Sequence, residues 1–254
     1  MNQANQKLLA DTAALAGELM LTSGAETYRA ENTMAHILKK GTNARVTTLA
    51  LTTSLMITLE TDTEQPLTIV RRISGGSIKL SRIVRVNEIS RNYCDDLITL
   101  EEAYEQLKNI PSREYNSEIF NLATVGVATG FTMFFGGTWM EIIATLITSS
   151  VLALLITFLK KYQAGGFVLN CISSIGLSFT CIALKNTIMP GIDTDIVIIG
   201  SIMPLVPGVA ITNAIRDTLQ GDYISGCARI LEAFITAAAI AVGVGLGMLY
   251  YRLL

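Results

Sequence analysis

The sequence contains few of the residues that usually carry metal or redox chemistry. Among 254 residues there is one histidine, His36, and there are four cysteines. The cysteines form no CxxC pair and no spacing typical of zinc ligands; they are Cys94, Cys171, Cys181 and Cys227. We therefore expect no metal site and no cofactor.

Charged residues are also scarce, at 16% of the chain, where a soluble domain has about 25%. They concentrate in residues 1–118, which hold 13 Lys/Arg and 15 Asp/Glu, whereas residues 119–254 hold 6 and 6. The formal net charge of −2 argues against nucleic-acid binding, which needs a concentrated positive face. Neither a G-x-S-x-G elbow nor a Walker A pattern is present, so we predict no catalytic residues and no enzyme activity.

The second half contains five apolar segments of about 20 residues, enough to cross a hydrocarbon core of about 30 Å. They cover residues 118–136, 138–159, 165–185, 192–212 and 229–250. We predict an α-helical membrane domain over residues 116–254 with five transmembrane helices. Residues 1–10 lack the pattern of a signal peptide, which favours a cytoplasmic N-terminus.

Loop charges predict the orientation of these spans. The loop after the first segment has no Lys or Arg, whereas the loop after the second contains Lys160 and Lys161. This asymmetry places the N-terminus inside and the C-terminus outside. We expect a multi-pass protein of the cytoplasmic (inner) cell membrane.

Small polar side chains form helical stripes in the first three segments, and the stripes include Glu141 and Asn170. Such stripes can be helix-packing faces, or several of them can line one hydrated path. The spacing leaves both interpretations open. Two G-x-x-x-G patterns, Gly126 to Gly130 and Gly243 to Gly247, favour helix packing.

The fourth segment cannot be an unbroken helix, because it contains Pro204, Pro207 and Gly208. Broken backbone at membrane depth is tolerated only inside protein or beside a water-filled cavity. Transporters build substrate sites at such breaks. A structural proline kink is the alternative.

Ionisable and amide side chains crowd the inner end of the fourth and fifth segments. Such groups are costly near a bilayer unless they are paired or functional. We expect Arg229 to pair with Glu232, three residues later. The candidates for a substrate or proton path here are Asn213, Arg216, Asp217, Arg229 and Glu232.

Residues 1–115 are predicted to form a small cytoplasmic α+β domain. An amphipathic helix over 5–23 is followed by a possible capping box, Ser23 to Glu26, and by a helix that ends at Gly41. Strands are expected at 44–50, 54–60 and 67–72, and helices at 78–94 and 100–109. A second capping box is expected at Thr99 to Glu102.

Four polar residues in the stretch after Ser23 form a candidate cytoplasmic motif: Glu26, Tyr28, Arg29 and Glu31. They can also be a solvated helix face in which Glu26 and Arg29 form an ordinary i,i+3 pair.

Two stretches, 23–31 (SGAETYRAE) and 207–233 (PGVAITNAIRDTLQGDYISGCARILEA), resemble the threonine/serine exporter family. Full-length members carry about ten spans, so this chain resembles the larger subunit of the split form. That form works with a small membrane protein that supplies the other spans. The resemblance implies gradient-driven export of a small carboxylate: a dicarboxylate such as succinate for the split form, or threonine and serine for the fused form.

On this basis we expect an exporter subunit. Arg216 and Arg229 would attract the carboxylate, and Asn213 with the break at 204–208 would orient it. Glu232 or Asp217 could carry a proton. Two alternatives remain: a membrane-anchored hydrolase with its site in the N-terminal domain, and a non-transporting regulatory subunit.

Overall fold

The computed structural model describes residues 3–60, 65–111 and 115–253 and is mostly helical. The chain divides into two compact units. Unit 1 contains Met1–Ser112 together with Val209–Leu231, and unit 2 contains Arg113–Gly208 together with Glu232–Leu254. Residues 209–231, which lie far along the chain, therefore belong with the N-terminal part.

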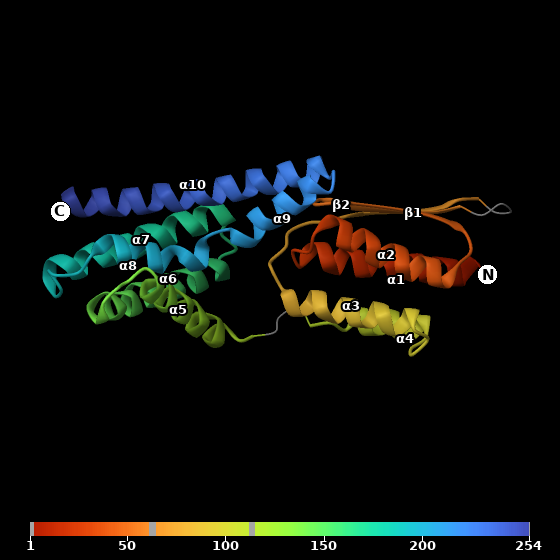
Figure 1. Cartoon of the computed structure of the whole chain (residues 1–254), viewed down its shortest axis with the longest axis horizontal. Helices are drawn as coiled ribbons and strands as arrows, with labels where there is room; N and C mark the ends of the chain where they lie inside the picture. The colour runs from red at the N-terminus through yellow and green to blue at the C-terminus, as the bar shows by residue number, and fades with distance from the viewer. Residues whose placement is uncertain (1–2, 61–64, 112–114, 254) are drawn as a thin grey trace. The chain divides into compact units, whose positions relative to one another are not determined.

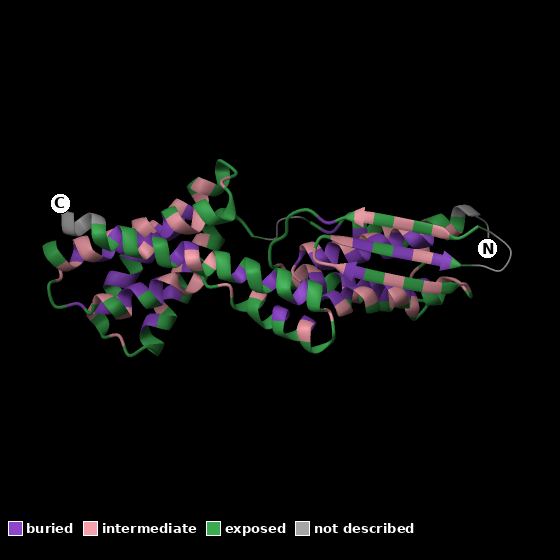
Figure 2. Ribbon diagram, turned by 90° about the horizontal axis from the view of Figure 1, so that it is seen from above, coloured by how far each residue is buried: buried purple, intermediate pink, exposed green. Residues whose placement is uncertain are grey.

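The N-terminal part of unit 1 is a three-stranded antiparallel sheet with helices (Figures 1 and 2). The strands lie in the order β1-β2-β3. Their bounds are Arg45–Leu51, Ser54–Glu60 and Leu67–Arg72. The helices are α1 (Gln3–Thr22), α2 (Thr27–Gly41), α3 (Leu80–Cys94) and α4 (Leu100–Lys108). The three strands agree with the sequence prediction to within one residue at each end.

The core of unit 1 lies between one face of the sheet and the helices. Strand β2 alternates, so that Leu55, Ile57 and Leu59 are buried while Met56 is exposed. Helix α1 contributes mainly small residues, which allow close approach: a Cβ at Gly17 would collide with the side chain of Met34 on α2.

Unit 2 is built from helices α5 (Ser117–Phe134), α6 (Trp139–Lys161), α7 (Gly166–Thr187) and α8 (Thr194–Ile202). A 3₁₀ turn, Met203–Leu205, ends α8, and α9 (Gly208–Leu219) follows after a short break. Helix α10 (Tyr223–Leu253) is continuous, and it begins in unit 1 and ends in unit 2. The predicted break at the prolines of the fourth segment is therefore confirmed.

Three described helices are long and apolar enough to cross a membrane: α6, α7 and Tyr223–Leu249 of α10. The bent pair Thr194–Leu205 and Gly208–Leu219 makes four if it counts as one span. Helix α5 occupies the first predicted segment but is not among them. Its 18 residues include Glu118, Asn121, three threonines and two glycines, which lower its mean hydropathy.

The polar stripes of the membrane segments are buried faces within unit 2. The hydroxyls of Thr132 and Thr145 lie 2.9 Å apart, and those of Thr148 and Ser201 lie 2.8 Å apart. All four side chains are fully buried. The stripes thus join α5, α6 and α8, as expected of helix packing.

The two G-x-x-x-G patterns behave differently. A Cβ at Gly243 would clash with the Cys171 carbonyl and with Ser174, and one at Gly247 would clash with Ser178 and Ile175. That pattern is a packing seam between α10 and α7, as predicted. A Cβ at Gly126 or Gly130 would meet nothing within 4 Å among the described residues, so this pattern is not a packing seam there.

Two predicted helix caps are wrong, and one is confirmed. Helix α2 begins after Glu26 without a side-chain cap, and the Ser23 hydroxyl has no hydrogen-bond partner among the described residues. At its C-terminal end, α2 is capped by Thr42, whose backbone is extended, and Gly41 does not adopt the predicted left-handed conformation. The Thr99–Glu102 capping box is present: the side chain of each residue accepts a hydrogen bond from the backbone N–H of the other.

Candidate functional site

The candidate site in unit 1 begins at the turn between α1 and α2, residues 23–26. Gly24 has a φ of +82°, a conformation that favours glycine, and the turn is closed by N–H groups that donate to carbonyls of the last turn of α1. The carbonyls of Gly24 and Ala25 remain available to accept other donors. The turn therefore presents two carbonyl oxygens and the side chain of Glu26.

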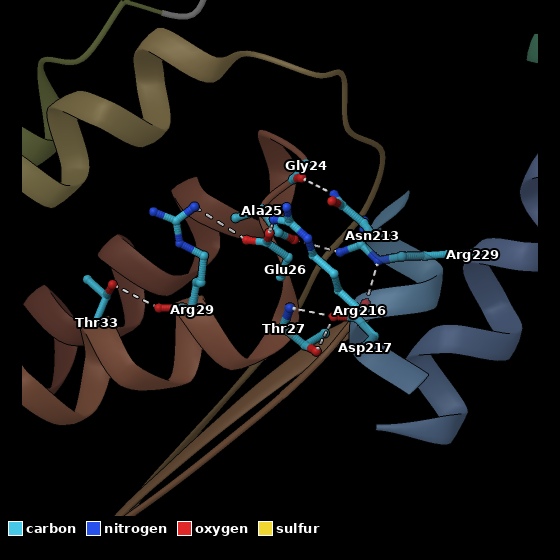
Figure 3. A network of polar contacts seen from close by, with 10 residues as sticks. All are labelled: Gly24, Ala25, Glu26, Thr27, Arg29, Thr33, Asn213, Arg216, Asp217 and Arg229. Carbon is cyan, nitrogen blue, oxygen red and sulfur yellow. Dashed lines mark hydrogen bonds and ion pairs between the residues drawn. The ribbon is translucent and has the colours of Figure 1, made fainter. Parts of the chain in front are cut away.

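Helix α9 and the start of α10 bind these two carbonyls directly (Figure 3). The Asn213 side chain donates from Nδ2 to the Gly24 oxygen over 2.7 Å. Arg229 donates from Nη2 to the Ala25 oxygen over 2.6 Å. Each contact joins residues that are about 190 to 200 positions apart in the chain.

Asp217 is the fully buried centre of the network. Its Oδ1 accepts from the backbone N–H of Thr27 at 3.2 Å and from the Thr27 hydroxyl at 3.0 Å. Its Oδ2 lies 2.9 Å from Nε of Arg229, whose side chain is also buried. The buried charge is therefore balanced by an ion pair, which is the condition under which a protein interior tolerates it.

Glu26 lies between two arginines. One carboxylate oxygen contacts Nη1 of Arg216, and the other lies 3.4 Å from Nη1 of Arg29. The Glu26 side chain is 5% exposed, whereas that of Arg216 is 61% exposed. Burial raises the pKa of Glu26, but the Arg216 hydrogen bond and the nearby positive charges outweigh it and hold the pKa below its ordinary value.

Glu31 is a second carboxylate near this network. Its Oε1 accepts from the backbone N–H of Ala50 on β1 over 2.7 Å. Burial raises the pKa of Glu31, and the negative charge of Asp222 adds to the increase, while the Ala50 hydrogen bond opposes it. Asp222 itself lies 2.8 Å from the Thr27 hydroxyl.

The structure brings together six of the predicted site residues within unit 1: Glu26, Arg29, Asn213, Arg216, Asp217 and Arg229. The predicted Glu26–Arg29 pair is present. The predicted pairing of Arg229 with Glu232 is wrong, because Arg229 pairs with Asp217. Glu232 is exposed on α10. Tyr28 and Glu31 lie half-buried on α2 beside the network.

The other predicted path residues belong to unit 2. Glu141 caps α6 and accepts from Thr138, and its Oε1 accepts from the Asp193 N–H over 3.0 Å. Asn170 lies half-buried near the start of α7. Pro204, Pro207 and Gly208 form the break between α8 and α9.

Sequence reasoning missed Thr27 and the two backbone carbonyls. The available signal was the Gly-Ala-Glu-Thr order, in which a glycine turn precedes a hydroxyl at the first position of a helix. Among the described residues, no group of three or more His, Cys, Asp or Glu side chains could hold a metal ion.

The two stretches that build this network also relate the chain to known proteins. A family described as "Putative threonine/serine exporter" matches residues 11–251, nearly the full chain. The chain belongs to this family. The match includes both the turn at 23–27 and the α9–α10 segment, so the network lies within the part of the chain that defines membership.

A curated relative is the "Probable threonine/serine exporter" of Mycobacterium tuberculosis (strain ATCC 25618 / H37Rv). It is 24% identical over 230 residues, which is 89% of this chain and 43% of the relative. The chain thus spans less than half the length of this relative. No solved structure matches the chain.

Proposed function

We propose that this chain is a subunit of a secondary exporter that moves small carboxylated metabolites out of the cytoplasm. Membership of the exporter family supports a transport role. The substrate class that we propose is a dicarboxylate such as succinate, or threonine and serine. All of these carry a carboxylate that an arginine can bind.

The observation that carries the proposal is the half-exposed guanidinium of Arg216. One of its nitrogens is bound to Glu26, while most of the side chain faces outward. An arginine has five N–H donors in a planar fork and can hold a second carboxylate through two parallel hydrogen bonds. Arg216 is therefore the group that we assign to the substrate.

The remaining charged groups have a different proposed role. Arg229 and Asn213 are committed to the carbonyls of Ala25 and Gly24, so they fix the position of α9 and do not face a substrate. Asp217 is held by Thr27 and Arg229. We propose that these groups position Arg216. Glu232, which is exposed, remains the proposed proton carrier of α10.

We propose five spans, with the N-terminal α+β domain of residues 1–115 on the cytoplasmic side of the inner membrane and the C-terminus outside. Helix α5 counts as the first span although its mean hydropathy is low. Tryptophan and tyrosine at the two ends of α6 support a span next to α5, because these residues favour the membrane interface. Trp139 is the first residue of α6 and Tyr162 follows its last residue, and both side chains are exposed.

We further propose that the remaining spans come from a small membrane protein that acts as a partner. This chain covers 43% of the length of the curated relative. Among the described residues, a Cβ at Gly126 or Gly130 on α5 would also meet nothing within 4 Å.

The test is efflux from cells loaded with labelled succinate, threonine or serine. Efflux is compared for the chain alone, the chain with its partner, and the pair carrying Arg216→Lys at matched membrane abundance. We expect transport only from the pair, and a loss of roughly tenfold or more in the variant, because lysine cannot reproduce the bidentate fork.

Arg45→Lys serves as the matched control, because Arg45 is an exposed arginine of unit 1 outside the network. Near-normal efflux in Arg216→Lys would contradict the role of Arg216. Efflux that is absent for every substrate in the intact pair would contradict the function itself.

A further inference from the structure

Glu26 is itself a carboxylate, the group that the proposed substrate would bring to Arg216. It contacts Nη1 of that arginine, so one end of the guanidinium is already occupied. Although burial raises the pKa of Glu26, its bond to Arg216 and the positive charges around it hold the pKa below its ordinary value, which keeps the side chain ionised at neutral pH. Arg216 is therefore bound to an internal carboxylate before any substrate arrives.

Arg29 is a second partner for the same carboxylate, and it is loosely engaged. Arg29 and Arg216 converge on Glu26 from α2 and α9 (Figure 3). One carboxylate oxygen contacts Arg216, while the other lies 3.4 Å from Nη1 of Arg29. A charge-assisted N–H···O bond is about 2.7–2.9 Å long, so the contact with Arg29 can shorten. The Arg29 side chain is 45% exposed, which leaves it room to move.

The backbone around Glu26 permits a change of partner. Glu26 is the N-cap residue of α2, with an extended backbone at φ −65° and ψ 146°, and in the part of the chain that the structure describes its side chain makes no cap hydrogen bond. Arg29 follows three residues later, and side chains at this spacing lie beside each other on a helix. A rotation of the Glu26 side chain toward Arg29 therefore breaks no cap bond of α2.

Charge balance links this rotation to the binding of a substrate. Two carboxylates on one guanidinium leave an excess negative charge, and they repel each other. When the same two carboxylates are shared between Arg216 and Arg29, two positive charges balance them. A substrate carboxylate at Arg216 is therefore favoured when Glu26 lies on Arg29.

We propose that Glu26 holds Arg216 in place of the substrate carboxylate and moves onto Arg29 when the substrate binds. The inference rests on the proposed function, because it takes Arg216 as the residue that receives the substrate. Glu26 is then an internal competitor of the substrate, and Arg29 is the residue that accepts it. A Glu26 that only positions Arg216 is the alternative, and it predicts weaker substrate binding where the competitor predicts tighter binding.

The test is the reactivity of single arginines toward phenylglyoxal, which modifies accessible guanidinium groups. The full chain with its partner, in detergent, is treated with and without succinate, threonine or serine. Mass spectrometry of the peptides gives the modification rates of Arg29 and Arg216. Arg45 is the internal reference, because it is exposed and lies outside the network, and its rate should respond to none of the three compounds.

In the wild type, the substrate should protect both arginines: Arg216 because the substrate binds there, and Arg29 because Glu26 moves onto it. In Glu26→Gln, Arg216 should be modified faster without substrate, and about tenfold less substrate should protect it, because the competing charge is lost. The substrate should no longer protect Arg29 in this variant. Arg29→Gln should raise the concentration that protects Arg216, because Glu26 then has no other arginine to move to.

Two further variants control for general effects on the fold. Glu60→Gln is the matched control, since it removes the carboxylate partner of the exposed Arg45 and should leave the protection of Arg29 and Arg216 unchanged. Glu26→Asp keeps the charge and suits the N-cap position, but its shorter side chain draws the carboxylate away from Arg216. It should lower the protecting concentration, as Glu26→Gln does.

An unchanged or higher protecting concentration in both Glu26 variants would overturn the inference, and so would an unchanged one in Arg29→Gln. Protection of Arg29 that persists in Glu26→Gln would also overturn it, because the substrate would then contact Arg29 directly. In each of these cases, protection of Arg216 in the wild type would leave the proposed function standing. If none of the three compounds protects Arg216 in any variant, the proposed role of Arg216 is contradicted, and the inference with it.

Discussion

At the scale of single residues, the chemistry of unit 1 depends on how one buried carboxylate is satisfied. Asp217 cannot keep its charge in the interior without partners, because removal from water costs several kcal/mol per ion. It is matched by Arg229 and by two donors of Thr27. Because Arg229 pairs with Asp217, Glu232 lacks the partner that the sequence predicted for it.

Asp217→Asn should strongly destabilise unit 1. The substitution leaves the buried guanidinium of Arg229 without a counter-charge, and breaking a buried pair in this way costs about 3–5 kcal/mol. Thermal unfolding of the full chain in detergent measures the effect. Glu105→Gln, which disrupts the exposed Glu105–Lys108 pair, is the control and should change stability by less than about 1 kcal/mol. Equal effects in the two variants would contradict the assigned role of Asp217.

We predict that the contribution of Glu31 to folding stability depends on pH with the opposite sign to the contribution of Glu26. Because its pKa in the folded state is raised above 4.5, the folded chain binds this proton more readily than the unfolded chain. Its contribution is therefore favourable at low pH and is lost as the pH rises from 4.5 through the folded-state pKa. Glu31→Gln should abolish that loss while it keeps an acceptor for Ala50.

The measurement for Glu31 is the Tm of wild type and Glu31→Gln across pH 4 to 8. We expect the variant to gain relative to wild type as the pH rises above 4.5. Glu26 supplies the contrast: its pKa is lowered, so its contribution is present above 4.5 and declines as the pH falls below that value. A constant Tm difference between wild type and Glu31→Gln at every pH would refute the prediction.

At the scale of elements, glycines decide where helices can approach one another. Gly226 in the first turns of α10 lies so close to Thr218 and to the Ala214 carbonyl that a Cβ would collide with both. This contact holds α9 against α10 and keeps Asn213, Asp217 and Arg229 in register. In unit 2, Gly243 and Gly247 have the corresponding role between α10 and α7.

Gly243→Ala should destabilise unit 2 by about 1–3 kcal/mol, because the added methyl group meets the Cys171 carbonyl and Ser174 in a packed interior. Gly126→Ala is the matched control, since in the described part of the chain nothing lies within 4 Å of the added Cβ. It should be neutral or stabilising by about 0.5–1 kcal/mol, as alanine is the better helix former. Thermal unfolding in detergent compares the two, and a larger loss for Gly126→Ala would reverse the assignment of the seams.

At the scale of the whole molecule, helix α10 is shared between the two units. Its first nine residues belong to the network of unit 1, and the rest belongs to unit 2.

The proposed topology predicts the location of reporters fused to the chain. A reporter active only outside the cytoplasm should be active after Leu254 and inactive when it is inserted in the loop after Lys161. The physical basis is the excess of Lys and Arg on the inner side. A C-terminal reporter that is active only in the cytoplasm would show that one of the five proposed spans, α5 foremost, does not cross.

Most elements could be predicted from the sequence, because their signals are local. Alternation of apolar residues predicted β2, the Thr99–Glu102 box predicted the start of α4, and the prolines at 204 and 207 predicted the break. The wrong predictions concern polar side chains for which the sequence allowed more than one arrangement. Ser23 could cap α2 or stay buried, and Arg229 could pair along its own helix or across to α9.

The sequence by itself determined that the chain has a charged half and an apolar half, and where the fourth apolar segment breaks. These properties follow from hydropathy and backbone chemistry, which act over a few residues. Only the tertiary structure decided that residues 209–231 join the N-terminal unit and that Asp217 lies against Thr27. Contacts between groups 190 positions apart depend on the packing of whole elements, and no local pattern encodes that packing.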